Sequence, residues 1–438
     1  MKASEEKFQQ ATERYLHWLG TKVTLVPKEV DKRHSRIAES TPFEFLRATF
    51  YRWAQWWPEV CEDLHRQDVP LVLGVGDLHA ENFGTWRDME GRLVWGVNDF
   101  DECSYLPYTN DLVRLAASAW FAIEEQAILA LKDVKELPKK ARKKAVKQHM
   151  KALRKRDEVQ QHVHEAFSAA CMAILSGYCD GLHIQCQRTE SNDAGRASGR
   201  EPFVLAEKHD WLREIVLNKL RERKDDGEEV KGQDAEDDFD EFFTEMKHLP
   251  YVNNVVPRSA WDALSQSMPE PAMSFRICQR EAGLGSLGRQ RFTAIVDDWW
   301  GGIVAREAKA LAPSAWLWWD ETRQDTTEIL YPEALRYAVR ARDSWMHIYL
   351  GPPHHSWVVR RLAPDSGKVK LKDLPQGGRL EAHLWHAMGR EVANVHVPLG
   401  DVQTDLVKRN NNPAWLGQAA NAMADKIVEE WSIVYKPE

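Results

Sequence analysis

The stretch GDLHAENFGTWRDMEGRLVWGVNDFDE, residues 76–102, holds several polar side chains that can carry out chemistry. It follows a short apolar run, Pro70–Val75, which predicts a buried strand. A second predicted strand, Arg92–Val97, lies inside the stretch. Binding and catalytic side chains are frequently found on loops that a rigid scaffold positions. The polar residues that follow each of these two strands are therefore candidates for a functional site.

Three of these residues form an oxygen-rich set. Asp77 and Asn82 follow the first predicted strand, and Asp99 follows the second. If the two strands pair as a hairpin, their ends bring these side chains together. Two carboxylates and an amide oxygen suit Mg²⁺, and Asp101 adds a third carboxylate, so one remains available as a base. The alternative is that these residues only cap turns.

The spacing within the stretch is typical of a kinase active site. Asn82 follows Asp77 by five positions, as the metal-binding Asn follows the base in the protein-kinase catalytic loop. Asp99, Phe100 and Asp101 stand where a kinase has its metal-binding D-F-G sequence. The order of these two motifs along the chain is also that of a kinase.

These motifs carry a resemblance to a known group of enzymes. GDLHAEN…NDFD resembles the GDLHPGN…IDFD signature of aminoglycoside and choline phosphotransferases, which belong to the protein-kinase-like superfamily. The longer run, which continues into NDLVRLAAS at residues 110–118, is similar to an uncharacterised bacterial family, the domain of unknown function 2252. The resemblance implies a protein-kinase-like fold with ATP and Mg²⁺ as cofactors and a nucleotide and an acceptor substrate as partners.

The same resemblance implies a role for each residue of the motifs. Asp77 is expected to accept the proton of an attacking hydroxyl or to orient that hydroxyl, and His79 to donate a hydrogen bond near the transferred phosphate. Asn82 and Asp99 are expected to hold Mg²⁺. Asp101 either binds a second metal ion or only turns the chain.

A further aspartate, Asp111, begins a predicted helix over residues 110–131. It matches an aspartate that follows the same motifs in the phosphotransferase group. We expect it to be structural and to bond the backbone of the catalytic loop from the start of the helix.

A glycine-rich sequence lies far downstream, in the second half of the chain. Gly283, Gly285, Ser286 and Gly288 belong to a G-x-G-x-x-G pattern between two predicted strands, where backbone amides can cover phosphates. No long helix is predicted to open directly after it, which disfavours a dinucleotide-binding fingerprint.

The positive charge that would neutralise the phosphates has two candidates. Arg306, in the strand-like run GGIVAREAK, stands where the resembling family has a lysine, and Lys309 is the alternative. Glu333 is a candidate ion-pair partner from the helix equivalent to the kinase C helix, and a solvated helical glutamate is an equal alternative. Arg360 or Arg361 also has the reach to contact a phosphate, but side chains alternate along a strand, so one of the two should face solvent.

The glycine-rich sequence follows the catalytic loop, whereas it precedes that loop in kinases. The predicted fold is therefore α+β and two-lobed, a circular permutation of the kinase layout. Residues 1–273 are predicted to form a helical lobe with the catalytic and metal-binding loops, residues 274–362 an antiparallel sheet lobe, and residues 363–438 helices that return to the helical lobe.

The predicted function is an ATP- and Mg²⁺-dependent phosphotransferase that acts on a hydroxyl of a small-molecule acceptor. Three alternatives stay open at this point. The same motifs serve a nucleotidyl transferase that transfers AMP, and Arg306 in place of lysine keeps open a nucleotide-binding pseudokinase that acts as an interaction module. A metal-dependent hydrolase would use the carboxylates without ATP.

Composition narrows the classes of protein further. The chain has 438 residues and a net charge of −8, which disfavours binding to nucleic acid. No apolar run approaches the roughly 18–20 residues that span a bilayer, so a cytoplasmic location is expected. The six cysteines form no C-x-x-C pair, and we expect reduced, mostly buried thiols.

Other segments predict local structure only. Apolar spacing predicts helices over residues 4–20 and 42–65. The basic run 132–156 and the acidic run 222–241 are expected to be solvated surface, although the basic run has the charge to attract phosphate.

Overall fold

The structure is a computed structural model of the chain. It describes residues 6–66, 68–131, 141, 144–148, 157–183, 201–205, 211–212, 244–252, 255–271, 273–279, 288–320, 322–363, 378–398 and 401–434. Within these residues the fold is mixed α+β with three small sheets, as predicted for the fold class. The acidic run 222–241 and most of the basic run 132–156 lie outside the described residues.

The helices fall into an N-terminal group, a central pair and a C-terminal group. The N-terminal group is α1 (Phe8–Lys22), α2 (Pro27–Ala38), α3 (Pro42–Ala48), α4 (Phe50–Val60) and α5 (Glu62–His65). The central pair is α6 (Tyr108–Leu129) and α9 (Asp157–Gly181). The others are a short 3-10 helix η2 (Ala80–Asn82), α12 (Arg258–Gln266), α13 (Ala315–Trp319), α14 (Tyr331–Tyr337), α15 (Gly378–Val395), α16 (Val402–Arg409) and α17 (Trp415–Val434).

The three sheets are antiparallel in all of their described pairings. The first contains β11 (Val397–Pro398), β1 (Leu71–Gly74) and β4 (Ser104–Pro107), in that order. The second contains β2 (Phe83–Arg87), β3 (Leu93–Val97) and β5 (Phe203–Val204). The third has five strands, in the order β6 (Arg276–Cys278), β7 (Arg291–Trp299), β8 (Gly302–Ala310), β10 (Trp357–Arg361) and β9 (His347–Tyr349).

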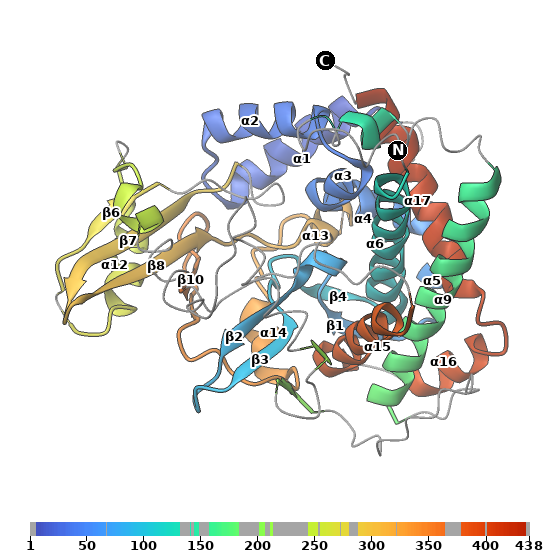
Figure 1. Cartoon of the computed structure of the whole chain (residues 1–438). Helices are drawn as coiled ribbons and strands as arrows, with labels where there is room; N and C mark the ends of the chain where they lie inside the picture. Colours follow the sequence, from blue (N-terminus) through green and yellow to red (C-terminus); the bar gives the residue numbers. More distant parts are fainter. Residues whose placement is uncertain are drawn as a thin grey trace.

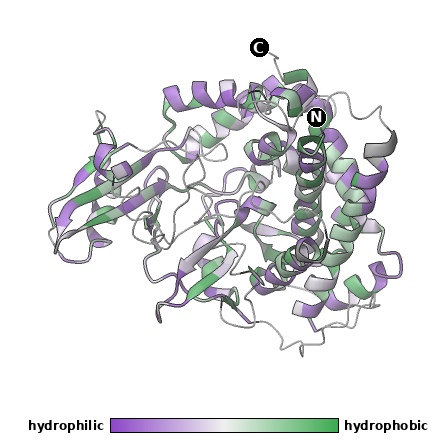
Figure 2. Cartoon of the chain, in the orientation of Figure 1, coloured by the Kyte–Doolittle hydropathy of each residue, from purple (hydrophilic) through white to green (hydrophobic). Residues whose placement is uncertain are grey.

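The long helices pack around α6, which is buried along most of its length. Helix α15 lies along α9, and α6 contacts both α9 and α17. Figure 1 shows the five-stranded sheet on one side of the molecule and these helices on the other, with β1 to β4 between them. In Figure 2, α6 is mostly green, whereas α2 carries much purple, as burial of an apolar helix in the core requires.

The five-stranded sheet confirms the strands predicted after residue 274. Strands β6 and β7 pair through Cys278 and Thr293, so the glycine-rich sequence connects two antiparallel neighbours. Strand β8 is the third strand of this sheet in chain order, and α14 lies between β8 and β9 along the chain. Helix α12 packs against β8 and β10.

The single helix predicted over residues 42–65 is wrong, because the chain forms three shorter helices there. The break falls at Thr49, whose ψ of 39° leaves the helical region. The buried Arg33 side chain donates to the carbonyl of Ala48 at 2.7 Å, which satisfies an oxygen that the break frees. A tertiary hydrogen bond of this kind leaves no signal in the apolar spacing.

The predicted hairpin between residues 70–75 and 92–97 is also wrong, although both strands form. Strand β1 pairs with β4 and β11, whereas β3 pairs with β2 and β5. The segment Phe83–Arg87, which reads as a polar loop, forms β2 and takes the place beside β3. The two strand ends still meet, but through side-chain hydrogen bonds rather than through a shared ladder.

The cysteines follow the prediction in part. Cys61, Cys103, Cys171 and Cys278 are free and buried, as expected. Cys179 is disulfide-bonded, so the prediction of reduced thiols throughout is wrong at this position. Within the described part of the chain, every helix is too short or too polar to cross a membrane.

Candidate active site

The predicted catalytic loop begins directly after β1 in a tight turn. Gly76 has a φ of +80°, and a Cβ atom there would lie 2.2 Å from the carbonyl oxygen of Glu102. The buried carboxylate of Asp111 accepts the backbone N–H of Val75 at 2.6 Å and that of Gly76 at 2.9 Å. The predicted structural role of Asp111 is therefore confirmed.

Asp111 is itself held by a buried pair of side chains from outside the loop. His396 Nε2 lies 3.0 Å from Asp111 Oδ2, and His396 Nδ1 lies 2.8 Å from the hydroxyl of Tyr178. An ionised carboxylate only accepts hydrogen bonds, so the N–H of His396 points at Asp111. The first turn of α6, the end of α15 and α9 are thereby joined at the base of the catalytic loop.

Asp77 is held by Arg114, one turn along α6 from Asp111. Arg114 Nε donates to Asp77 Oδ1 at 2.9 Å, and Arg114 Nη2 donates to the same oxygen. The guanidinium lies 4.9 Å from the ring centroid of Phe50 and 4.8 Å from that of Trp53. Among the described residues, both side-chain hydrogen bonds to Asp77 end on Oδ1, and none ends on Oδ2.

Asn82 joins the catalytic loop to the loop after β3. Its Nδ2 donates to the carbonyl of Asp99 at 2.9 Å and to that of Asp77 at 3.3 Å. Its Oδ1 accepts the backbone N–H of Asp99 at 3.0 Å. The structure thus brings Asp77, Asn82 and Asp99 together, as the motif spacing predicts.

Asp99 and Asp101 form an acidic pair that is surrounded by cations. Lys309 Nζ lies 3.1 Å from Asp99 Oδ2 and also pairs with Asp101. Arg360 Nη2 lies 3.4 Å from Asp99 Oδ1, and Arg289 Nη1 lies 3.4 Å from Asp101 Oδ2. Burial, followed by the neighbouring Asp99, raises the pKa of Asp101.

The structure distinguishes the two candidates for the phosphate-neutralising cation. Lys309 faces the acidic pair from β8, whereas Arg306 lies on the opposite face of that strand. Arg306 Nε donates to the carbonyl of Ser267 at 2.9 Å, and its guanidinium lies 5.1 Å from the ring centroid of Trp345. Burial, together with the nearby Arg361, lowers the pKa of Arg306 to about 10.

The remaining predicted residues are placed differently. Gly288 lies at the exit of the glycine-rich sequence, before β7, whereas Gly283, Gly285 and Ser286 lie outside the described residues. His79 is buried, and its ring packs edge to face against Phe43.

Glu333 is not brought to either candidate cation. It lies in the first turn of α14, and no ion pair within the described residues joins it to Lys309 or Arg306. Helix α14 instead contacts the site through Tyr331. The Tyr331 hydroxyl accepts from Arg360, and its ring lies edge to face against Phe100.

The donor set fits a divalent cation that arrives with phosphate. Within the described residues, no group of three or more His, Cys, Asp or Glu side chains is arranged to hold a metal ion. Asp101 Oδ1 is buried and has no hydrogen-bond partner within the part of the chain that the structure describes, and it belongs to the same turn as Asp99. Magnesium is often held by one or two carboxylates, with the other ligands supplied by substrate phosphates and water. Asp99 and Asp101 provide two such carboxylates, whereas the amide oxygen of Asn82 already accepts the backbone N–H of Asp99.

A family match covers this loop system. Residues 25–177 match DUF2252, a family described as an uncharacterized protein conserved in bacteria. The DUF2252 segment contains both loops of the acidic site and the whole of α6. It ends before the five-stranded sheet, so Lys309 and Arg360 lie outside the matched residues. No curated protein and no solved structure matches the chain.

Sequence reasoning missed two arginines of this site. Arg114 lies three positions after Asp111, a spacing that places both on one face of α6, so the helical periodicity contained this signal. Arg289 follows the last glycine of the glycine-rich sequence, and nothing in that pattern predicts its side-chain partners.

Glu391 is a buried carboxylate that hydrogen-bonds to the end of β3, and we expect its titration to make the unfolding free energy depend on pH. Its carboxylate accepts the backbone N–H of Val97 at 3.2 Å and the Nδ2 of Asn394 at 2.9 Å. Burial raises the pKa of Glu391 to about 7, although Asn394 and Arg340 act in the opposite direction.

We expect Glu391→Gln to flatten the dependence of stability on pH. Between about pH 4.5 and pH 7 the folded chain keeps a proton that the unfolded chain releases, so the unfolding free energy falls as pH rises. The contribution is about 3 kcal/mol across this range. Urea unfolding of both proteins at pH 5 and pH 7.5 measures it. Equal pH dependence of the two proteins would contradict the prediction.

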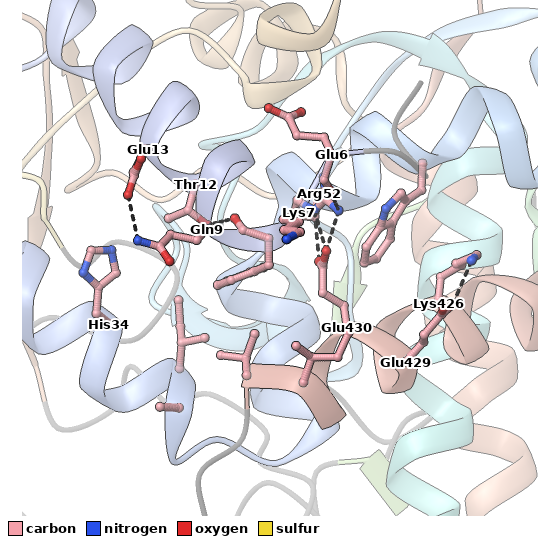
Figure 3. Close-up of a pocket in the computed structure, with 16 residues that line it drawn as sticks. Glu6, Lys7, Gln9, Thr12, Glu13, His34, Arg52, Lys426, Glu429 and Glu430 are labelled. Carbon is pink, nitrogen blue, oxygen red and sulfur yellow. Dashed lines mark hydrogen bonds and ion pairs between the residues drawn. The ribbon is translucent and has the colours of Figure 1, made fainter. Parts of the chain in front are cut away.

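A concave region lies away from this loop system. A cavity of about 770 Å³ opens between α1, α2, α4 and α17 (Figure 3). Arg52 lies in its wall, where its Nε donates to both carboxylate oxygens of Glu430, at 3.0 and 2.9 Å. No residue predicted from the sequence for the active site lines this cavity.

Proposed function

We propose that the chain is an ATP- and Mg²⁺-dependent phosphotransferase of the protein-kinase-like superfamily, with a circularly permuted order of its parts. The observation that carries the proposal is the contact of Lys309 with Asp99, two residues that lie 210 positions apart. Kinases place a lysine on the third strand of the small sheet, after the glycine-rich loop, and a metal-binding Asp after the catalytic loop. Lys309 lies on the third strand here, and Asp99 lies beside Asn82.

The residues of the site support in-line transfer of the terminal phosphoryl group to a hydroxyl. The oxygen of the acceptor hydroxyl bonds to the terminal phosphorus, and the proton of that hydroxyl passes to Asp77 Oδ2. At the same time the bond from this phosphorus to the bridging oxygen of ATP breaks. ADP carries away that electron pair. Arg114 keeps the Asp77 carboxylate in place through Oδ1.

In this proposal, the cationic side chains of the five-stranded sheet bind the phosphates of the nucleotide. Lys309, on β8, would leave the acidic pair to bind the phosphates, and Arg360 lies on the neighbouring strand β10. Asp99, Asp101 and Asn82 would hold Mg²⁺, which when bound neutralises the phosphate charge that develops during transfer. A small-molecule acceptor is proposed because the catalytic loop resembles aminoglycoside and choline phosphotransferases more than protein kinases.

Thermal unfolding with ATP and Mg²⁺ tests the nucleotide site. A ligand at about 100 times its Kd stabilises the native state by roughly 2.7 kcal/mol, so we expect a rise of a few degrees that requires the metal. Asp99→Asn is expected to abolish the rise. Asp68→Asn, at an exposed surface ion pair, is the matched control and should keep it.

The fate of labelled ATP then separates phosphoryl transfer from nucleotidyl transfer. Incorporation of the γ-label into an acceptor supports the proposal, whereas incorporation of the α-label indicates transfer of AMP. Binding without release of either label would indicate a nucleotide-binding pseudokinase. If no nucleotide shifts the unfolding midpoint at several millimolar with Mg²⁺ or Mn²⁺, the proposal is wrong.

A further inference from the structure

The exit of the glycine-rich sequence is attached to the N-terminal helices. Gly288 has a φ of +96°, and its carbonyl oxygen accepts the backbone N–H of Val26 at 2.8 Å. The next residue, Arg289, forms an isolated antiparallel bridge with Leu25. Leu25 and Val26 belong to the short connection between α1 and α2. This connection therefore fixes the backbone at the end of the glycine-rich sequence.

The Arg289 side chain extends from this point into the acidic loop. The side chain is only 4% exposed, and its Nη2 donates to Glu102 Oε1 at 3.0 Å. Its Nη1 lies 3.4 Å from Asp101 Oδ2. Burial acts to lower the pKa of Arg289, but the adjacent carboxylates, Glu102 first, raise it, so the guanidinium is charged. One side chain thus bridges segments that lie 187 positions apart.

Glu102 is also held by the segment that follows β8. Its Oε2 accepts the backbone N–H of Ala315 at 2.6 Å, and its carbonyl oxygen accepts the hydroxyl of Ser314 at 2.9 Å. Both residues follow β8, the strand that carries Lys309. Arg289 therefore pairs with a glutamate that is also hydrogen-bonded to Ser314 and Ala315, so Glu102 cannot move without breaking those bonds.

We infer that Arg289 is a positioning residue of the proposed nucleotide site. It fixes Gly288, the last residue of the glycine-rich sequence, relative to Asp101 and Glu102, and it makes the connection between α1 and α2 part of the nucleotide site. The inference rests on the proposed function for its nucleotide role, whereas the attachment itself does not depend on that function. Arg289 meets the two carboxylates with two different nitrogens, Nη2 toward Glu102 and Nη1 toward Asp101, whereas a lysine would offer both of them a single nitrogen.

The test compares Arg289→Gln and Arg289→Lys with the wild-type chain. Arg276→Gln is the matched control, because Arg276 forms an ion pair with Asp297 in the same sheet and lies outside the active site. The first measurement is hydrogen exchange, without nucleotide, of peptides that contain Val26. The second is the Kd of Mg²⁺·ATP from titrated thermal shifts, together with kcat once an acceptor is known.

We expect Arg289→Gln to speed exchange at Val26 and to raise the Kd of Mg²⁺·ATP about tenfold, the scale of one charge-assisted hydrogen bond. Arg289→Lys should recover part of the affinity, and Arg276→Gln should leave it unchanged. If Arg289→Gln fails to fold because Glu102 is left unpaired, the double variant with Glu102→Gln removes that charge and keeps the test available.

The exchange measurement tests the attachment of Gly288 to Val26, and the affinity measurement tests the role of Arg289 in nucleotide binding. Faster exchange with unchanged affinity would overturn the positioning role and leave Arg289 a structural residue. Unchanged exchange at Val26 would overturn the attachment. If the wild-type chain binds no nucleotide, the proposed function and the nucleotide role of Arg289 fall together, while the exchange measurement still decides whether the attachment exists.

Discussion

Lys309→Met is expected to weaken the binding of Mg²⁺·ATP by roughly tenfold to a hundredfold, because the charge proposed to bind the phosphates is lost. The rate of phosphoryl transfer is expected to fall further, by roughly 10²- to 10³-fold, as for removal of a donor that stabilises charge in a transition state. Titrated thermal shifts measure the affinity, and release of the γ-label measures the rate. Arg289 and Arg360 still neutralise Asp99 and Asp101 in this variant, so the chain should stay folded.

Arg306→Met is the matched control for this prediction. It removes a positive charge from the same strand, three residues away and on the opposite face. We expect the variant to lose stability, because the carbonyl of Ser267 loses its donor, but to keep its affinity for Mg²⁺·ATP. The reverse result, with affinity lost at Arg306 and kept at Lys309, would contradict the assignment of the phosphate-binding cation.

Asp111→Asn is expected to lower the unfolding free energy by about 3 kcal/mol. The Asp111 carboxylate accepts two backbone N–H groups of the catalytic loop and the N–H of His396. An asparagine side chain presents an NH₂ group in place of one oxygen, so at least one buried donor would face another donor. Urea unfolding at pH 7 measures the loss.

The control for this prediction is Asp401→Asn. Asp401 caps the start of α16 through the backbone N–H of Thr404, and asparagine is an equally good residue at that position. We expect no resolvable change in its unfolding midpoint. If Asp111→Asn proved as stable as this control, the network of Asp111, His396 and Tyr178 would not be holding the catalytic loop.

Much of the candidate site could be predicted from local sequence. Asp77 and Asn82 lie five positions apart on one loop, and this short segment has few ways to arrange them. The strands before Asp77 and Asp99 are short apolar runs, and both form as predicted. The helix that begins near Asp111 was predicted from its apolar spacing, and α6 is buried along most of its length.

Pairing between distant segments could not be predicted in this way. The apolar pattern of a strand gives its buried residues but not its neighbour, so β2 was missed and the predicted hairpin was wrong. The arginines that hold the site are a similar case. Arg114 and Arg289 find their carboxylates through tertiary contacts, which have no periodic signature.

Arg306 and Lys309 illustrate the difference between what local sequence predicts and what depends on tertiary packing. Side chains alternate along a strand and these two residues are separated by an odd number of positions, so any strand that contains both presents them on opposite faces. Which of the two faces meets the acidic loop depends on tertiary packing. The segment after α12 and Trp345 cover Arg306 on one face, and this leaves Lys309 on the face that packs against Asp99.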